Sequence, residues 1–329
     1  MICRRCGLLQ PVAASAARFL PEPAMTPDTP ALRHNALVYQ SVDEYLTRAV
    51  PFLRHGLEQG EGAIVAHTKA GISMMREAFG ADAARVTFVD VGSAYTRPAR
   101  TLAAYHQVYA EQLRRTPKLR AVADVQFGPD PREWDLWTGY EAVFNRSFGH
   151  LPAWVLCSYN ANGTPDPIIE GVWRTHPEVV DGDGWTSSGR FEDPDRLLRR
   201  ITRTPELIPQ LRQIPFDDID TEQVRERLAA VLTAAGIDET RTLEMLLAAT
   251  EIADNAIRHG GGIADVRVGH AHGRFVCEIE DRGPGFDDPV AGYLAPREGI
   301  GSGLWVARQL TWQIEFFRSP AGFTSRIWL

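Results

Sequence analysis

Long apolar runs, blocks of basic residues and a disulfide framework are all missing from this sequence of 329 residues. No apolar run approaches the roughly 20 residues of a membrane-spanning helix, so we expect no association with a membrane. No block of Lys or Arg offsets the formal net charge of −7, which argues against nucleic acid as a direct partner. The spacing of the four cysteines (Cys3, Cys6, Cys157 and Cys277) is not that of a disulfide framework, so a reducing, cytoplasmic location is expected.

The first 30 residues differ from the rest of the chain. Cys3 and Cys6 have the spacing of half a zinc site, but no second Cys/His pair of suitable spacing follows, so we expect no structural zinc there. Four prolines between positions 21 and 30 disfavour a helix or a strand, and Met25 offers an alternative start. We therefore interpret residues 1–30 as a disordered leader that need not be native.

Strands and helices alternate from position 34 to about position 160. Apolar strands are expected at 36–39, 63–66, 86–89, 121–123 and 154–157, separated by helices at 41–59, 72–79, 98–115 and 131–148. Near-continuous apolar strands between helices predict an α/β domain with a doubly wound, mostly parallel sheet, whose ligands bind at the carboxyl ends of the strands. The sequence of this half contains no Gly-x-x-x-x-Gly-Lys loop, which argues against a nucleotide site here.

Polar residues occur near several of the expected strand ends. They are His34, His67, Asp90, Glu141, Asn145, Cys157, Tyr159, Asn160 and the turn Thr175-His176-Pro177. Taken one at a time, each has an ordinary structural explanation, since a lone Cys at a strand end is usually a small core residue and a His-Pro pair often forms a turn. We therefore expect core and turn positions there.

Composition changes again after this domain. Residues 177–190 are rich in Gly and Asp, a short helix is expected at 194–203, and three prolines follow it. The chain is therefore predicted to divide into a disordered leader (1–30), an α/β domain (31–178), a linker with a short helix (179–213) and a C-terminal domain (214–329).

The C-terminal domain contains three short segments in a fixed order. The first lies on a helix expected at 241–259, where apolar positions recur at helical spacing. Glu251, Asn255, Arg258 and His259 share the opposite stripe of this helix. The amide oxygen of Asn255 suits Mg²⁺, and Glu251, one turn earlier, can deprotonate a nucleophile. A solvated polar face is the alternative interpretation.

The second segment follows an alternating strand at 274–280. Asp281 lies at the end of this strand, where its carboxylate can accept a hydrogen bond from the exocyclic amine of a base. Gly283 and Gly285 leave room for a ring to lie against the backbone. Taken alone, this segment would also be explained by an ordinary turn.

The third segment opens a helix with the alternating glycines Gly299, Gly301 and Gly303, followed by Leu304. Backbone N–H groups at such a helix start can approach phosphate oxygens. A Rossmann interpretation fails because a loop at 286–298, and not a strand, precedes the glycines. That loop is a candidate for a flexible lid.

Together the three segments resemble the N, G1 and G2 boxes of the GHKL ATPases, the superfamily of gyrase, Hsp90, histidine kinases and MutL. The end of the chain is similar to the last strand of that α+β Bergerat sandwich, and the compact span of 214–329 is more similar to the anti-sigma-factor serine kinases than to relatives with longer lids. The resemblance implies that Asn255 holds Mg²⁺, that Glu251 is the catalytic base and that Asp281 reads the adenine of ATP. The other nucleotide contacts are expected at Arg258, His259, Gly283, Gly285, Gly299, Gly301, Gly303, Leu304 and Thr324. Phe323 departs from the pattern, since many relatives carry the first of two threonines there.

The α/β domain resembles the MEDS sensory family, named for methanogen, methylotroph and dichloromethane-regulator proteins. The matching stretches include Pro51-Phe52-Leu53, Tyr140-Glu141 with Asn145, Leu156-Cys157 with Tyr159, and Thr175-His176-Pro177. That family is thought to sense small molecules, so the resemblance implies an input domain with an unnamed small-molecule ligand.

The two resemblances imply a sensor-linked anti-sigma factor. Its C-terminal domain would be an ATP- and Mg²⁺-dependent serine/threonine protein kinase that acts on an anti-anti-sigma factor and thereby controls the availability of a sigma factor. A sensor histidine kinase is the alternative, but it needs a helical hairpin with a phosphoacceptor histidine, whereas 178–215 is rich in Gly and Pro and has only His176 nearby. An ATP-binding regulatory module without transfer activity is a third interpretation, and homodimerisation stays open.

Overall fold

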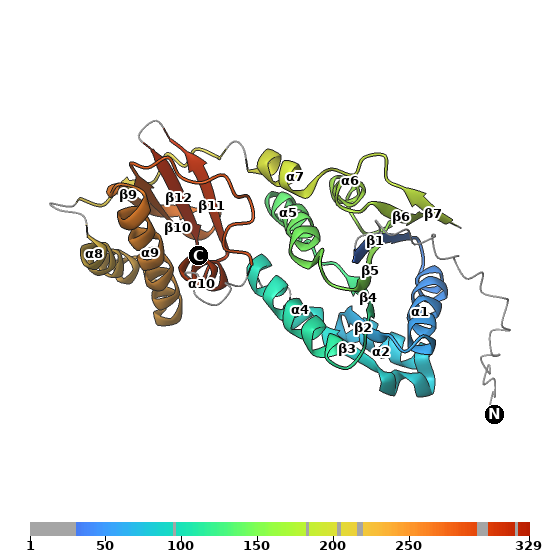
Figure 1. Ribbon diagram of the computed structural model, residues 1–329. Coiled ribbons are helices and arrows are strands. Elements are labelled where there is room, and N and C mark those ends of the chain that lie inside the picture. The colour runs from blue at the N-terminus through green and yellow to red at the C-terminus, as the bar shows by residue number, and fades with distance from the viewer. Residues whose placement is uncertain are drawn as a thin grey trace, which may run out of the picture.

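The computed structural model describes residues 31–94, 97–181, 184–202, 205–215, 220–294, 302–319 and 322–329. Within these ranges the chain forms two sheets, each with its own helices (Figure 1). No helix in the described ranges is both long and apolar enough to cross a bilayer. The leader predicted at 1–30 lies outside them.

The first sheet has seven strands, in the order β3-β2-β4-β5-β1-β6-β7. The strands are β1 (Leu32–Tyr39), β2 (Gly62–His67), β3 (Val86–Asp90), β4 (Leu119–Asp124), β5 (Ala153–Asn160), β6 (Glu178–Asp181) and β7 (Gly184–Ser187). All neighbouring pairs are parallel except β6 and β7. The doubly wound, mostly parallel sheet predicted for this half is therefore confirmed.

Helices cover both faces of this sheet (Figure 1). The helices α1 (Val42–Glu58) and α2 (Lys69–Phe79) pack on one face, and α4 (Pro98–Leu113), α5 (Pro131–Phe148) and α6 (Asp166–Thr175) pack on the other, while α3 (Val91–Ala94) is a single turn. Side chains alternate along a strand, so neighbouring residues of β5 lie on opposite faces. Leu156 packs in the apolar cluster beneath α1 and α2, whereas Val155 and Cys157 pack in the cluster beneath α4, α5 and α6.

Local sequence signals explain where several helices begin. Ser41 Oγ accepts the backbone N–H of Glu44 at 3.1 Å, and the Glu44 carboxylate accepts the N–H of Gln40 at 2.7 Å, so these two side chains satisfy two backbone donors at the start of α1. The helix α5 begins at Pro131 after the N-cap Asp130, whose side chain accepts a backbone N–H of the first turn.

The first sheet extends beyond position 178, where we predicted the linker to begin. The strand β6 pairs in parallel with β1, and β7 continues the sheet as an antiparallel edge. Val179 and Val180 are almost fully buried, one on each face of the sheet. Two apolar residues between a Thr-His-Pro-Glu segment and a Gly- and Asp-rich segment were too short a pattern to predict this strand.

The second sheet is entirely antiparallel, with the order β11-β12-β10-β9-β8. Its strands are β8 (Arg212–Gln213), β9 (Ile263–Ala271), β10 (Arg274–Asp281), β11 (Gln313–Arg318) and β12 (Phe323–Trp328), and its helices are α8 (Thr221–Ala234), α9 (Glu239–His259) and α10 (Gly303–Leu310). All three helices pack on one face and share a single apolar core with the sheet. The predicted α+β sandwich is therefore confirmed.

The helix α7 (Pro194–Ile201) lies between the two sheets and packs on α5 (Figure 1). Its Leu197 and Leu198 are buried in the same apolar cluster as α4, α5 and α6. Val290, which comes from the loop after β10, is buried in that cluster too. The linker helix and part of the second domain therefore contribute to the core of the first domain.

Charged pairs also connect the two domains directly. Arg97, the N-cap of α4, and Arg100 of α4 both reach Glu244 of α9, at 2.6 and 3.2 Å. Arg274 of β10 pairs with Glu133 of α5 at 2.9 Å. These contacts place the start of α4 and the start of α5 against the second domain.

Candidate nucleotide site

The helix α9 positions the first group of predicted site residues. Asp238 caps its start, and Ala249 and Ala253 bury one face of the helix against the sheet. Because residues four apart share a helix face, Glu251 and Asn255 lie next to each other on α9, beside the face that Ala249 and Ala253 bury.

A cavity of about 590 Å³ opens beside this side of α9. Eight of the predicted residues line it: Glu251, Asn255, Arg258, His259, Asp281, Gly285, Gly303 and Leu304. They come from α9, from the end of β10 with its following loop, and from the start of α10. The fold therefore brings the three sequence segments to one cavity, whose volume lies within the roughly 300–1,000 Å³ of small-molecule sites.

The carboxylate of Asp281 is seated by the backbone of two glycines. Its Oδ1 accepts the N–H of Gly283 at 2.8 Å. A Cβ added to Gly260 would lie 2.4 Å from Cγ of Asp281, and one added to Gly283 would lie 2.7 Å from Cα of Gly260. Gly283 does not line the cavity, so its absent side chain leaves room for this packing and not for a bound ring. Burial raises the pKa of Asp281, and the N–H of Gly283 partly offsets that effect.

Aromatic side chains form one wall of the cavity. The ring centroid of Phe286 lies 4.9 Å from that of Phe316 and 5.1 Å from that of Phe323. Gly285 has a φ of +65°, and a Cβ there would lie 2.1 Å from the Phe323 ring. This wall gives an apolar aromatic surface against which a purine can pack.

The start of α10 faces the carboxylate of Glu251. A Cβ added to Gly303, the first residue of α10, would lie only 2.1 Å from Glu251 Oε2. Ser302 precedes Gly303 and lines the same cavity. Because the N-terminus of a helix carries partial positive charge, this end of the cavity favours an anion.

The structure does not bring Thr324 to the cavity. Side chains alternate along β12, so Phe323 and Ser325 line the cavity while Thr324 lies on the opposite face of the sheet. The Thr324 hydroxyl is fully buried and has no hydrogen-bond partner among the described residues. The hydroxyl available to a ligand is therefore that of Ser325. The predicted contacts Gly299 and Gly301 lie outside the described residues.

Asp254 is a cavity residue that the sequence analysis missed. Its carboxylate accepts hydrogen bonds from Thr221 Oγ1 at 2.7 Å and from Arg258 Nη2 at 2.8 Å. The spacing of four between Asp254 and Arg258 was visible in the sequence as a helical ion pair. The aromatic wall left no such signal, because Phe316 lies on β11, a strand that we did not predict.

These residues fit a nucleotide with a divalent cation. The seated carboxylate of Asp281 can accept from an amine, the aromatic wall can stack a base, and the start of α10 can face phosphates. Asn255 contributes an amide oxygen of the kind that Mg²⁺ accepts alongside phosphates and water. Glycines lie at or beside the cavity at the points where a Cβ would clash with a neighbour: Gly260 and Gly283 beside Asp281, Gly285 beside Phe323, and Gly303 beside Glu251.

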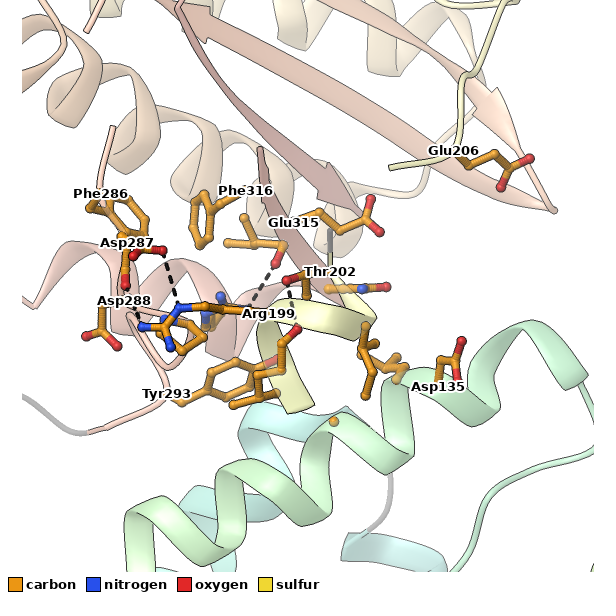
Figure 2. Close-up of a pocket in the computed structure, with 18 of the residues that line it drawn as sticks. Asp135, Arg199, Thr202, Glu206, Phe286, Asp287, Asp288, Tyr293, Glu315 and Phe316 are labelled. Carbon is orange, nitrogen blue, oxygen red and sulfur yellow. Dashed lines mark hydrogen bonds and ion pairs between the residues drawn. The ribbon is translucent and has the colours of Figure 1, made fainter. Parts of the chain in front are cut away.

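A second cavity, of about 320 Å³, lies at the junction of α5, α7 and the loop after β10 (Figure 2). Arg199 of α7 pairs with Asp287 of this loop at 3.4 Å. Arg308 of α10 donates to the carbonyl of Ala291 at 2.7 Å, and its guanidinium carbon lies 4.0 Å from the Tyr293 ring centroid. The first part of the predicted lid therefore packs between the linker helix and α10, while residues 295–298 lie outside the described residues.

Two known families match separate parts of the chain. Residues 33–177 match the family model of MEDS, the methanogen/methylotroph, DcmR sensory domain. Residues 214–327 match that of the histidine kinase-like ATPase domain. A curated UPF0210 protein of Corynebacterium glutamicum is 28% identical over 155 residues, which are 43% of this chain and 33% of that protein. The chain thus spans about a third of the length of that relative.

Proposed function

Because the chain joins a MEDS sensory domain to a GHKL-type histidine kinase-like ATPase domain, we propose that it is a sensor-linked anti-sigma factor with serine/threonine protein kinase activity. Its substrate would be a serine or threonine of an anti-anti-sigma factor in the cytoplasm. Phosphorylation of that partner would determine how much sigma factor stays bound, and a small molecule at the MEDS domain would set the rate.

The observation that supports this proposal is the meeting of Glu251, Asn255 and Asp281 at one cavity. In the proposed site ATP supplies the phosphoryl group, and Mg²⁺, held in part by Asn255, neutralises charge on the phosphates. Asp281 accepts a hydrogen bond from the adenine amine. Glu251 lies one helical turn before Asn255 and accepts the proton of the attacking hydroxyl.

The surroundings of His176 favour a serine/threonine kinase over a histidine kinase. The ring is fully buried at the end of α6, and its Nδ1 lies 3.0 Å from the carbonyl oxygen of Val172. A phosphoacceptor must reach the phosphoryl group, and this ring has no access to solvent. The described residues between 178 and 215 contain one helix, α7, of eight residues and no helical hairpin.

Phosphate labelling distinguishes the three interpretations. The full chain is incubated with γ-labelled ATP, with and without a candidate anti-anti-sigma protein. We expect label on the partner that survives acid and is removed by alkali, as for a phosphoester. Acid-labile label on the chain alone, lost in His176→Ala, would establish a histidine kinase instead.

Glu251→Gln serves as the inactive control in the phosphate-transfer experiment. It should remove the labelling of the partner, whereas Glu222→Gln, an exposed position on α8, should leave it unchanged. ATP binding without label on any of several candidate partners would favour the third interpretation, a regulatory module that binds nucleotide only.

A further inference from the structure

Four polar side chains come together inside the MEDS domain. They are His34 of β1, Glu141 of α5, Cys157 of β5 and His176 at the end of α6. One potential ligand atom from each lies within 4.8 Å of all the others. None of the four residues is more than 4% exposed. Positions that we expected to be separate core and turn residues therefore form one buried cluster.

The separations within the cluster are close to those around a tetrahedral ion. His34 Nε2 lies 3.2 Å from Cys157 Sγ and 3.3 Å from Glu141 Oε2. The same carboxylate oxygen lies 3.8 Å from His176 Nε2 and 4.0 Å from Cys157 Sγ. Ligand bonds of about 2.0–2.3 Å in a tetrahedron set the ligand atoms about 3.3–3.8 Å apart. Small side-chain movements would therefore bring all four atoms to bonding distance.

Hydrogen bonds outside the cluster orient both imidazole rings. Asn145 Nδ2 donates to two backbone carbonyls, so its Oδ1 is the acceptor that lies 3.0 Å from His34 Nδ1. The carbonyl of Val172 lies 3.0 Å from Nδ1 of His176. Since both partners are acceptors, each Nδ1 is the protonated nitrogen. Each Nε2 then directs a lone pair into the cluster, as in metal-binding histidines.

Two acceptor atoms of the cluster make no hydrogen bond within the described part of the chain. His176 Nε2 and Glu141 Oε1 are buried and have no hydrogen-bond partner among the described residues. A thiol proton on Cys157 can satisfy His34 Nε2, but it leaves His176 unsatisfied. A buried polar atom without a partner costs about 1–3 kcal/mol. One cation at the centre would give His176 Nε2 a partner and would bind the ligand atoms of the other three residues as well.

We propose that His34, Glu141, Cys157 and His176 bind one transition-metal ion of the Zn²⁺ class. Two imidazoles, a thiolate and a carboxylate are ligands that zinc takes together, whereas Mg²⁺ and Ca²⁺ prefer oxygen ligands alone. On binding, Cys157 releases its thiol proton to solvent. Four protein ligands close the coordination sphere, so the ion joins β1, β5, α5 and the end of α6.

The test titrates the full chain, after removal of metal by a chelator, with Zn²⁺ and separately with Co²⁺. We expect about one ion per chain and a thiolate-to-cobalt charge-transfer band, both lost in Cys157→Ser. Cys277→Ser is the matched control, because Cys277 is equally buried but lies in the ATPase domain. The double variant Cys3→Ser, Cys6→Ser should also keep the ion and the band.

Two further variants keep the test decisive if Cys157→Ser does not fold. Glu141→Gln and His176→Gln preserve side-chain size, and each should weaken Zn²⁺ binding more than loss of an outer hydrogen-bond partner does. Asn145→Ala removes such a partner of His34, so it should keep the cobalt band but bind about 10–100-fold more weakly. Circular dichroism checks the folding of each variant.

Two results would overturn the proposal. One is a wild-type chain that binds no more Zn²⁺ than Glu141→Gln and His176→Gln, which would identify the cluster as a hydrogen-bonded polar core. The other is loss of the ion in the Cys3→Ser, Cys6→Ser variant, which would move the site to the N-terminus. Neither result depends on the kinase activity proposed above.

Discussion

Replacing Asp281 by Asn tests adenine recognition more sharply than any other change in the cavity. One carboxylate oxygen of Asp281 already accepts the N–H of Gly283, which leaves the other for the base. Asn has almost the same shape, so it fits against Gly260 and keeps an acceptor for Gly283. It places an amide N–H₂ group, which cannot accept a hydrogen bond, where the adenine amine would donate.

The expected loss follows from a single hydrogen bond. A hydrogen bond to a charged group contributes about 1.5–3 kcal/mol. At 1.4 kcal/mol per tenfold change, the Kd for Mg²⁺-ATP should rise by about 10–150-fold in Asp281→Asn. Asp281→Ala should abolish measurable binding, because it also leaves the N–H of Gly283 without its partner.

Calorimetric titration of the full chain with Mg²⁺-ATP and Mg²⁺-ITP measures this effect. The wild type should prefer ATP, whereas the amide of Asp281→Asn can donate to the 6-oxo group of hypoxanthine and should reverse or cancel that preference. An ATP affinity within about twofold of wild type, with an unchanged preference over ITP, would refute the assignment of Asp281 to the base.

Three other variants and one pH profile examine the cavity and the packing that supports it. Glu251→Gln should lower phosphate transfer by roughly 10²–10⁴-fold, with little change in ATP affinity by calorimetry; transfer at the wild-type rate would remove Glu251 from its role. Asn255→Ala should weaken ATP binding measured with Mg²⁺ but not that measured in a chelator, and equal losses in both would argue against metal ligation. Gly283→Ala forces a Cβ against backbone and should lower the free energy of unfolding in urea by about 1–3 kcal/mol, whereas Gly189→Ala, with nothing within 4 Å, should not. Because burial raises the pKa of Asp281, ATP affinity should fall on acidification at a higher pH than an ordinary Asp would give, and Asp281→Asn should lack this fall.

Much of the fold was predictable because the apolar periodicity is strong where elements are long. The helix α5 was predicted with the bounds that the structure has, since Pro131 marks its start and the pattern runs unbroken to Phe148. The helix α6 and the strand β6 were not predicted, because each is short and lies next to turn-forming segments. Their burial depends on neighbours that lie far away in the sequence, such as β1 and α5.

The residues of the candidate site were predictable where a sequence motif marks a helix or the end of a strand. They were less predictable where strand pairing determines which side chains face the cavity. Asp281 and Glu251 were identified from such motifs and line the cavity. Which of Phe323, Thr324 and Ser325 faces it depends on the pairing of β12 with β10, which the sequence does not specify. The buried cluster of His34 and Cys157 needed the pairing of β1 with β5 as well.

The burial of Val290 bears on how such a chain can be recombined. Val290 belongs to the ATPase half of the sequence, yet its side chain is 4% exposed because it packs in the core of the MEDS domain. A different sensor grafted in front of this ATPase would have to offer a matching apolar recess, or leave Val290 and the neighbouring Tyr293 in water. The segment that must be kept together in a chimera therefore extends across the boundary between the two domains. It includes α5, α7 and residues 286–294, and a chimera that divides them is expected to expose this apolar surface to water and to aggregate.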